Sequence, residues 1–301
     1  MPTDENKNEH IPVLLSETIA GLDPRPGDDV IDCTVGAGGH ASAVLERTSP
    51  DGRLLGLDLD ETALDAARRK LERFGSRAML VRANYKDVGR VLLSHSFGPV
   101  QAALLDLGFS SLEIDDPARG FSFRKDGPLD MRYDRSQELT AADIVNNDSE
   151  ESLTRILWEY GEEKFSRTIA RAIVAARRQA PIVGTLQLEQ IVYGAVPGFY
   201  RRGRIHPATR TFQALRIATN DELGNVQTAL PILLDALASG GRLGVISFHS
   251  LEDRIVKKFF EAQAAAGRIE VLTKRPLIAT DEENERNPRA RSAKLRLARK
   301  L

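Results

Sequence analysis

The sequence predicts an α/β fold in which helices cover a mostly parallel sheet. Short apolar runs of strand length recur at 30–33, 53–57, 78–83, 100–105 and 242–248, and segments with helical spacing of apolar residues separate the first four. Polar residues and glycines follow several of these runs. In doubly wound sheets ligands bind at that end of the strands, so the same pattern predicts where the site lies.

The first two strands enclose a glycine turn. Residues 30–33 predict a buried strand, residues 36–40 (GAGGH) a tight turn and the following residues a helix, while the second strand ends at Asp58. Glycine lets a backbone approach a ligand because no Cβ intervenes, and a carboxylate at the neighbouring strand tip can hold both hydroxyls of a ribose. Three interpretations fit: a structural turn, a dinucleotide site with Ala41 as its third small residue, or an S-adenosylmethionine site.

The elements that complete this half of the chain alternate regularly. We expect a loop and short helix over 9–22, a helix over 60–73, a third strand over 78–83 followed by Tyr85, and a fourth strand over 100–105 that leads into Asp106. No such alternation continues between residues 108 and 241, a separation far longer than a crossover between neighbouring strands needs. The sequence therefore predicts an inserted domain.

The inserted residues have helical patterns. We expect helices over 141–146, 150–160, 163–178 and 186–195. A crossover helix over 221–238, with Pro231 as a kink or boundary, would return the chain to the sheet.

The end of the chain predicts a helix over 251–265, a strand over 268–273 and a final strand over 293–298. Basic and apolar residues alternate in the last of these, which is typical of an antiparallel or edge strand. One antiparallel strand at the end of a parallel sheet favours a methyltransferase over a dehydrogenase.

The amino-acid composition further restricts the class of protein. The chain has 301 residues, 42% of them hydrophobic and 28% charged, which is ordinary for a globular protein. No apolar run reaches membrane-spanning length, and the polar start MPTDENKNEH lacks the apolar core of a signal peptide, so we expect a cytoplasmic protein with no membrane partner. Cys33 is the single cysteine, which excludes an internal disulfide and a cysteine-cluster metal site. We expect Cys33 to be buried and no metal to be bound.

The net charge of −1 hides a segregation of charge. Residues 199–216, which we call the basic segment, contain five arginines and no acidic residue, and residues 286–301 contain seven basic residues and no acidic one. A local basic surface is enough for a nucleic-acid partner, whatever the total charge. Each run could equally be a solvated face, or in the tail the outward side of a strand.

Several long motifs resemble one family. They are 106–111 (DLGFSS), 120–123 (GFSF), 126–132 (DGPLDMR), 206–216 (HPATRTFQALR) and 247–253 (SFHSLED). In this order they are similar to the ribosomal RNA small-subunit methyltransferase H, or MraW, family, and the resemblance extends from His10 to the C-terminus.

The resemblance implies a class I Rossmann-like methyltransferase sheet with an inserted all-α domain. Residues 1–112 and 217–301 would form the methyltransferase domain and 113–216 the substrate-recognition domain. The implied reaction is N4-methylation, with S-adenosylmethionine, of a cytidine (1402 in standard rRNA numbering) in the decoding region of 16S rRNA. The implied partner is 16S rRNA or the small ribosomal subunit, and a homodimer is compatible with these features.

The family's cofactor contacts match residues that the sequence itself singles out. By resemblance they are the turn residues and strand-tip residues Gly38, Gly39, His40, Asp58, Tyr85, Asp106 and Glu113. Glu113 departs from the family, which usually has Gln there, and a carboxylate accepts hydrogen bonds but cannot donate as an amide does.

No catalytic base follows from the motifs. Asp106 is a cofactor ligand or a proton acceptor, and we favour the ligand role. Asp130 and His249 are weaker candidates for proton handling, and His249 could equally cap the helix that follows it. The alternatives are an amino-methyltransferase for DNA or a small molecule and a nicotinamide-dependent oxidoreductase.

Overall fold

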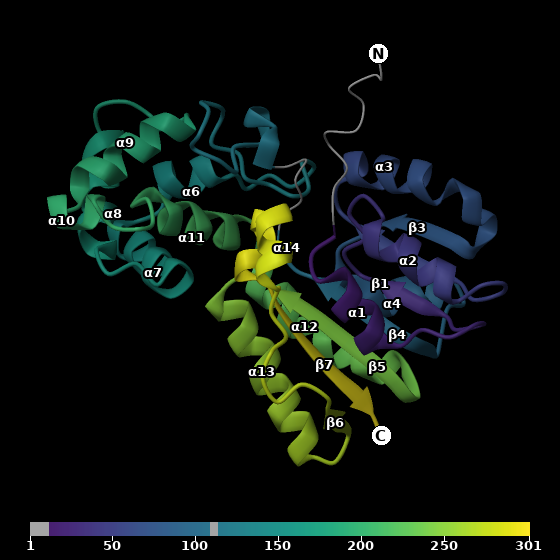
Figure 1. The fold of residues 1–301 in the computed structure, drawn as a ribbon. Helices are drawn as coiled ribbons and strands as arrows, with labels where there is room; N and C mark the ends of the chain where they lie inside the picture. The colour runs from purple at the N-terminus through teal and green to yellow at the C-terminus, as the bar shows by residue number, and fades with distance from the viewer. Residues whose placement is uncertain (1–11, 109–113) are drawn as a thin grey trace. The chain divides into compact units, whose positions relative to one another are not determined.

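The computed structural model describes residues 12–108 and 114–301. The chain divides into two compact units, unit 1 (Met1–Gly108 with Leu223–Leu301) and unit 2 (Phe109–Glu222) (Figure 1). Unit 1 is formed by two separate parts of the sequence, as expected if unit 2 is an insertion. Helix α11 (Ala208–Asn220) runs without a break through the boundary expected at residue 216. The assignment of residues 113–216 to substrate recognition stays a prediction.

Unit 1 is built on a mixed sheet. Its described residues form seven strands in the order β3-β2-β1-β4-β5-β7-β6. Pairing is parallel from β3 to β5, and β7 is antiparallel to both β5 and β6. The strands are β1 (Val30–Asp32), β2 (Leu54–Asp58), β3 (Ala78–Arg82), β4 (Val100–Asp106), β5 (Leu237–Ser247), β6 (Ile269–Val271) and β7 (Lys294–Lys300). The antiparallel last strand confirms the prediction of an α/β sheet of the methyltransferase kind.

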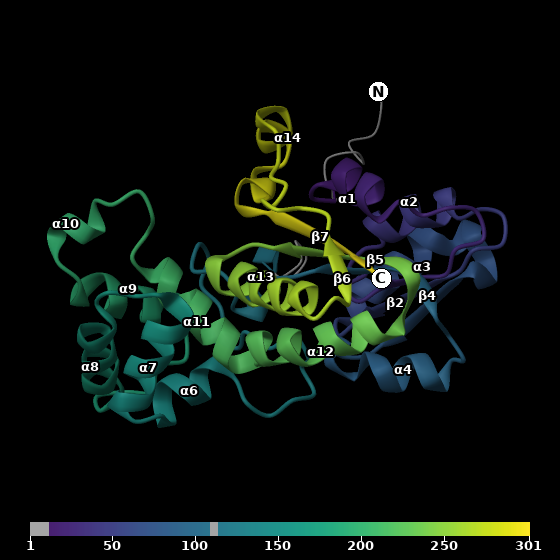
Figure 2. The same ribbon diagram turned by 90° about the horizontal axis from the view of Figure 1, so that it is seen from below.

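Helices cover both faces of this sheet (Figure 2). Alternate residues of β4 point to opposite faces, so Ala103 and Leu105 join one apolar core while Ala102 and Leu104 join the other. The first core is shared with α4 (Val88–Ser94), α12 (Glu222–Ala236) and α13 (Ser250–Ala265). The second is shared with α1 (Leu15–Leu22), α2 (Gly39–Arg47) and α3 (Glu61–Leu71). Shorter elements are η1 (Glu72–Arg77), η2 (Tyr85–Asp87), α14 (Asp281–Arg286) and η4 (Pro288–Ser292).

Unit 2 is helical and has its own apolar core. Its elements besides α11 are η3 (Pro117–Arg119), α6 (Ala141–Asn147), α7 (Glu150–Gly161), α8 (Ser166–Arg177), α9 (Thr185–Ala195) and α10 (Gly198–Arg201). Helix α6 begins with a capping box between Thr140 and Asp143, which explains its sharp start. Helices α7 and α11 approach so closely that a Cβ on Gly161 would lie 2.7 Å from the carbonyl oxygen of Arg210. Glycine is therefore required at that crossing.

One sequence expectation was wrong. Pro231 lies inside α12 and neither ends nor visibly divides it; burial of Val226, Leu230 and Leu233 offsets the roughly 3 kcal/mol that an interior proline costs. The residues between β6 and β7, for which the sequence predicted no element, contain the short helix α14. Strand β7 is antiparallel, which is one of the two possibilities expected for it, and it lies between β5 and β6 and so is not an edge.

The internal position of β7 explains its basic residues. The side chain of Arg296 is only 9% exposed and donates to Asp253 at 2.6 Å, while Lys294 lies 3.3 Å from the same carboxylate. Arg299 pairs with Glu270 on the neighbouring strand β6. Burial alone would raise the pKa of Asp253, but the hydrogen bond and charge of Arg296 outweigh it and hold the pKa below its ordinary value. Much of the basic tail therefore stabilises the sheet.

We expect Asp253→Asn to lower the free energy of unfolding by about 3 kcal/mol at pH 7, because it leaves the Arg296 charge buried without its partner. The pKa of Asp253 is depressed in the folded state, so this stabilisation is present above about pH 4 and is lost as the pH falls further. Urea unfolding at pH 7 and pH 3 measures both effects. Glu270→Gln, which breaks the more exposed pair with Arg299, is the control and should cost at most about 1 kcal/mol. Equal losses in the two variants would contradict the assignment.

Candidate functional site

In the glycine turn after β1, some glycines are closely packed against neighbouring residues and one is not. Gly36 and Gly38 have φ angles of 51° and 80°, which favour glycine. A Cβ on Gly38 would lie 3.3 Å from Leu71, and one on Gly39 would lie 2.3 Å from Pro12. Among the described residues, a Cβ on Gly36 would meet nothing closer than 3.9 Å. Gly38 and Gly39 thus set the packing of the turn, and Gly36, which the sequence analysis did not select, leaves room for a ligand.

Asp58 ties this turn to the tip of β2. One carboxylate oxygen accepts from the Gly36 N–H at 2.9 Å and the other from the Asp60 N–H at 2.9 Å. Desolvation raises the pKa of Asp58 to about 6, although these backbone donors act in the opposite direction. The Leu59 N–H also donates to this carboxylate, which leaves one of its about four lone-pair positions for a ligand hydroxyl. Asp58 can therefore hold a ribose and the turn at the same time.

A buried charged cluster lies behind the turn. Asp32, at the end of β1, is 2% exposed, and His40, in the first turn of α2, is 6% exposed. The His40 Nε2 atom lies 3.6 Å from the Asp106 carboxylate at the tip of β4. Burial alone would lower the pKa of His40, but interaction with Asp106 raises it above its ordinary value. Burial raises the pKa of Asp32 to about 7, against the opposing charge of His40.

This cluster fits the charged end of S-adenosylmethionine. Within the described residues, the Oδ1 atom of Asp106 has no hydrogen-bond partner. The ring nitrogens of His40 make no hydrogen bond of ordinary length there either, although longer interactions with Asp106, at 3.6 Å, and with the Val13 backbone raise its pKa. A buried polar atom without a partner costs about 1–3 kcal/mol, so such atoms point to a ligand that satisfies them. The cofactor's methionine portion carries an ammonium and a carboxylate, which are the groups that Asp106 and His40 could bind.

The remaining predicted cofactor residues differ in how they are placed. Tyr85 begins η2 just after β3 and is half-buried against the apolar core. The Asp106 N–H donates to the Thr34 hydroxyl at 2.6 Å, which joins the β4 tip to the turn after β1. The structure thus brings Gly38, Gly39, His40, Asp58, Tyr85 and Asp106 to the carboxyl ends of β1–β4. Glu113 lies outside the described residues.

Cys33 follows β1 and is 1% exposed. Burial raises the pKa of its thiol well above the ordinary value, which keeps the thiol protonated. It is the buried apolar residue that the sequence predicted.

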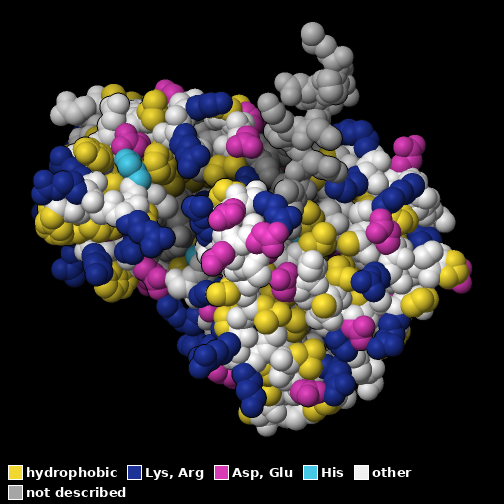
Figure 3. All heavy atoms as spheres, in the orientation of Figure 1, with side chains coloured by type: hydrophobic (Ala, Val, Ile, Leu, Met, Phe, Trp, Pro, Cys, Tyr) yellow, Lys and Arg dark blue, Asp and Glu magenta, His cyan; other side chains and the backbone are white. Residues whose placement is uncertain are grey.

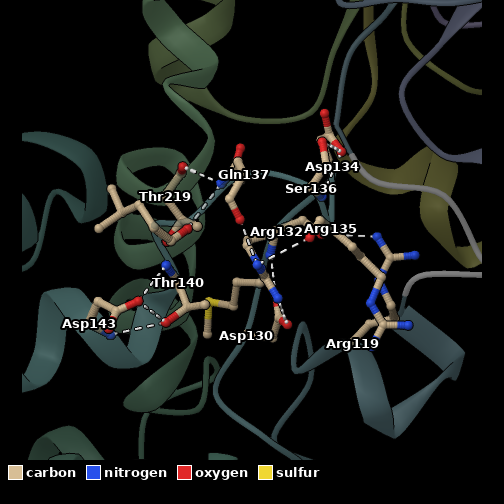
Figure 4. Close-up of polar contacts among 12 residues, drawn as sticks. Arg119, Asp130, Arg132, Asp134, Arg135, Ser136, Gln137, Thr140, Asp143 and Thr219 are labelled. Carbon is tan, nitrogen blue, oxygen red and sulfur yellow. Dashed lines mark hydrogen bonds and ion pairs between the residues drawn. The ribbon is translucent and has the colours of Figure 1, made fainter.

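Asp130 is held in an ion pair within unit 2 (Figure 4). Arg132 donates to both of its carboxylate oxygens at 2.8 Å and also to the carbonyl oxygens of Arg135 and Gln137. Burial alone would raise the pKa of Asp130, but the hydrogen bonds from Arg132 lower it below its ordinary value. A carboxylate so stabilised is a weak proton acceptor. Its catalytic role stays a prediction.

His249 caps α13, which is the second of the two roles considered for it. Its Nδ1 atom accepts from the Glu252 N–H at 3.4 Å, and the Glu252 carboxylate accepts from the His249 and Phe248 N–H groups. This is a capping box with histidine in the first position. Proton handling by His249 also stays a prediction.

Only part of the basic segment is exposed. Arg210 donates to the Glu162 carbonyl oxygen, and Arg216 forms a buried bidentate pair with Glu222 at 2.7 and 2.9 Å. Arg201 donates to the carbonyl oxygens of Gly194 and Val196, both at 2.9 Å. Arg202 and Arg204 are exposed and make no hydrogen bond or ion pair with the residues that the structure describes.

The sheet order, the antiparallel β7, the glycine turn and the acidic strand tips define a class I methyltransferase. The chain belongs to the MraW methylase family, whose sequence profile matches residues 7–301. Membership confirms the family predicted from the motifs and S-adenosylmethionine as the cofactor, and it decides against a nicotinamide-dependent oxidoreductase.

Curated relatives align over almost the whole chain. The proteins called ribosomal RNA small subunit methyltransferase H from Heliobacterium mobile and Geobacter sulfurreducens are 48% and 50% identical, and each alignment covers 97% of this chain and 99% of the relative. The protein of that name from Symbiobacterium thermophilum is 50% identical over 97% of this chain and 96% of its own length. Among the described residues, no helix is long and apolar enough to cross a membrane.

We expect Asp58→Asn to weaken S-adenosylmethionine binding by about 1.5–3 kcal/mol, because the ribose loses a charged acceptor. Wild-type affinity should also fall as the pH drops below about 6, since the pKa of Asp58 is raised to that value and the neutral acid is a poorer acceptor. Titration calorimetry from pH 5 to pH 8 measures both. The exposed Asp51→Asn is the control for the charge change. Unchanged affinity in a folded Asp58→Asn protein would remove this residue from the site.

Proposed function

We propose that this protein transfers a methyl group from S-adenosylmethionine to N4 of a cytidine, residue 1402 in standard numbering, in the decoding region of 16S rRNA. The observation that carries the proposal is the 48–50% identity, over 97% of the chain, to proteins called ribosomal RNA small subunit methyltransferase H. We further propose that it acts in the cytoplasm on 16S rRNA or the small subunit, and that it can form a homodimer.

The described residues support binding and alignment of the reactants. When bound, S-adenosylmethionine supplies an electrophilic methyl group on a sulfonium, and transfer is an in-line displacement whose rate depends on alignment. Asp58 would hold the ribose, while the open side of Gly36 lets the backbone approach the cofactor. The Asp106 carboxylate and the His40 ring would fix the methionine portion.

Proton removal from the amine is a separate requirement. The exocyclic nitrogen of cytosine is a weak nucleophile because its lone pair is delocalised into the ring, so an acceptor for its N–H helps the reaction. Asp130 is engaged with Arg132, and His249 uses Nδ1 in the cap of α13. Asp106 keeps one carboxylate oxygen without a partner in the described part of the chain. We retain the cofactor role for Asp106, with proton acceptance as its alternative.

The reaction and its site can be tested together. We expect the purified protein to transfer tritiated methyl groups to 16S rRNA or small subunits from cells that lack it, with mass mapping locating N4-methylcytidine at position 1402. Small subunits from cells that contain the protein are the control and should accept little. Transfer to DNA oligonucleotides or free nucleosides alone, or a modified position elsewhere in the rRNA, would overturn the proposal.

A second test concerns the basic segment. We expect Arg202→Glu with Arg204→Glu to weaken RNA binding and to flatten its salt dependence by a slope of roughly 0.7–0.9 for each phosphate that the variant no longer binds. Cofactor affinity and thermal stability should not change, because both side chains are exposed and unpaired within the described residues. Arg201 is left intact because it caps α9. Arg47→Glu with Arg69→Glu, exposed on α2 and α3, is the matched control. A normal salt slope in the double variant would exclude this RNA contact.

A further inference from the structure

Unit 2 contains a row of flat side chains that leads from its core to its surface. Phe212, which is 5% exposed, packs edge-on against Phe123 at a ring distance of 4.9 Å, and Phe123 lies 4.8 Å from the ring of His206. The His206 and Tyr193 rings are stacked with an angle of 20° and centres 5.9 Å apart. The Arg201 guanidinium lies 4.9 Å from the centre of the Tyr193 ring. The row thus ends in a cation–π pair.

Hydrogen bonds hold the outer members of the row in place. The His206 Nδ1 atom accepts from the Ala208 N–H at 3.3 Å, and its Nε2 atom lies 3.2 Å from the Glu189 carboxylate. Arg201 is fixed by the two carbonyl oxygens at the end of α9. The orientation of these planes is therefore set before any ligand arrives, which lowers the entropy cost of binding.

The outer members are nevertheless exposed. Tyr193 is 41% exposed and the side chain of His206 is 38% exposed. With centres 5.9 Å apart, the two rings cannot overlap fully, which agrees with the exposure of both. In Figure 3 the side of unit 2 that carries α9 and α10 shows Lys and Arg side chains beside hydrophobic ones, with a histidine at the surface. Packing of the core of unit 2 does not require this row of rings to extend to the solvent-exposed surface.

The charge around the row favours an anionic partner. No acidic residue occurs between Glu189 and Asp221, a stretch that contains five arginines. Glu189 itself is engaged with His206. Arg202 and Arg204 follow directly on Arg201 and are exposed. Aromatic faces with nearby cations are the surface on which unpaired bases stack, whereas the bases of a duplex already stack on each other.

We propose that Tyr193 and His206 form a stacking site for an unpaired nucleobase of RNA, with Arg202 and Arg204 holding neighbouring phosphates. The inference rests on the proposed function for the identity of its partner, RNA. It adds the place on unit 2 that binds a single-stranded segment and the kind of contact that binds it. It predicts a preference for unpaired RNA that phosphate contacts alone would not give.

The test compares unpaired and paired RNA on the full-length protein. The probes are twelve-residue oligo(A), oligo(U) and their duplex, and anisotropy gives each dissociation constant. Tyr193→Leu keeps apolar volume but removes the flat face, so binding of oligo(A) should weaken about 5- to 150-fold, which corresponds to 1–3 kcal/mol. Duplex binding should change less than about twofold, and Tyr193→Phe should bind all three probes as the wild type does.

Phe199→Ala is the matched control, since Phe199 is an exposed aromatic in the same segment that lies outside the row. Thermal melting shows whether each variant is folded. If Tyr193→Leu melts early, Tyr193→Phe keeps the test valid, because phenylalanine retains the aromatic ring without the hydroxyl and the variant must still bind RNA. Equal weakening on duplex and unpaired RNA, or unchanged binding by Tyr193→Leu, would overturn the proposal. Methyl transfer by the wild type to 16S rRNA is measured separately, so a failure of the proposed reaction is distinguished from a failure of this contact.

Discussion

The hydrogen bond from the Gly36 N–H to the Asp58 carboxylate is the contact on which the proposed cofactor site depends. It joins the turn after β1 to the tip of β2, and the bond from the Asp106 N–H to Thr34 joins the same turn to the tip of β4. Both are possible because β1 lies between β2 and β4 in the sheet. The sheet order therefore brings these residues together: a different neighbour for β1 would separate residues that are distant in sequence and that we propose to bind one ligand.

The same site holds charges that the folded chain does not fully satisfy. Asp32 and His40 are buried beside Asp106, and desolvation opposes the charged form of the first two. A protein selected for stability alone would pair these groups or replace them by apolar residues, since buried unpaired polar atoms are unfavourable. Their presence is understandable if a zwitterionic ligand completes the network. These buried groups lower the stability of the free protein, and a ligand that satisfies them gains binding free energy. This is the usual relation between strain at a site and its function.

Sequence patterns predicted the sheet and most helices because burial imposes their periodicity. They also brought together the residues that follow β1 to β4, since parallel strands share one carboxyl edge. Three features needed the structure. Gly36 and Asp32 were not selected, because openness above a glycine and burial of a carboxylate are properties of the fold. Helix α11 was not predicted, because residues 199–216 were considered for their charge and their motif but not for helical spacing. The tolerance of α12 for Pro231 depends on apolar contacts with other elements.

The basic residues show that amino-acid composition alone does not identify a nucleic-acid surface. The basic segment and the tail have similar charge, and both could have been nucleic-acid surfaces. In the tail, Arg296 and Arg299 lie on an internal strand and pair with acids of unit 1. In the basic segment, Arg216 and Arg210 bind within unit 2, which leaves Arg202 and Arg204 exposed next to the aromatic row. A charge that is already neutralised by a fixed partner releases few counterions on binding RNA, so only exposed arginines contribute to affinity. Pairing in the folded chain, and not the number of arginines, therefore decides which basic run can serve as the RNA surface.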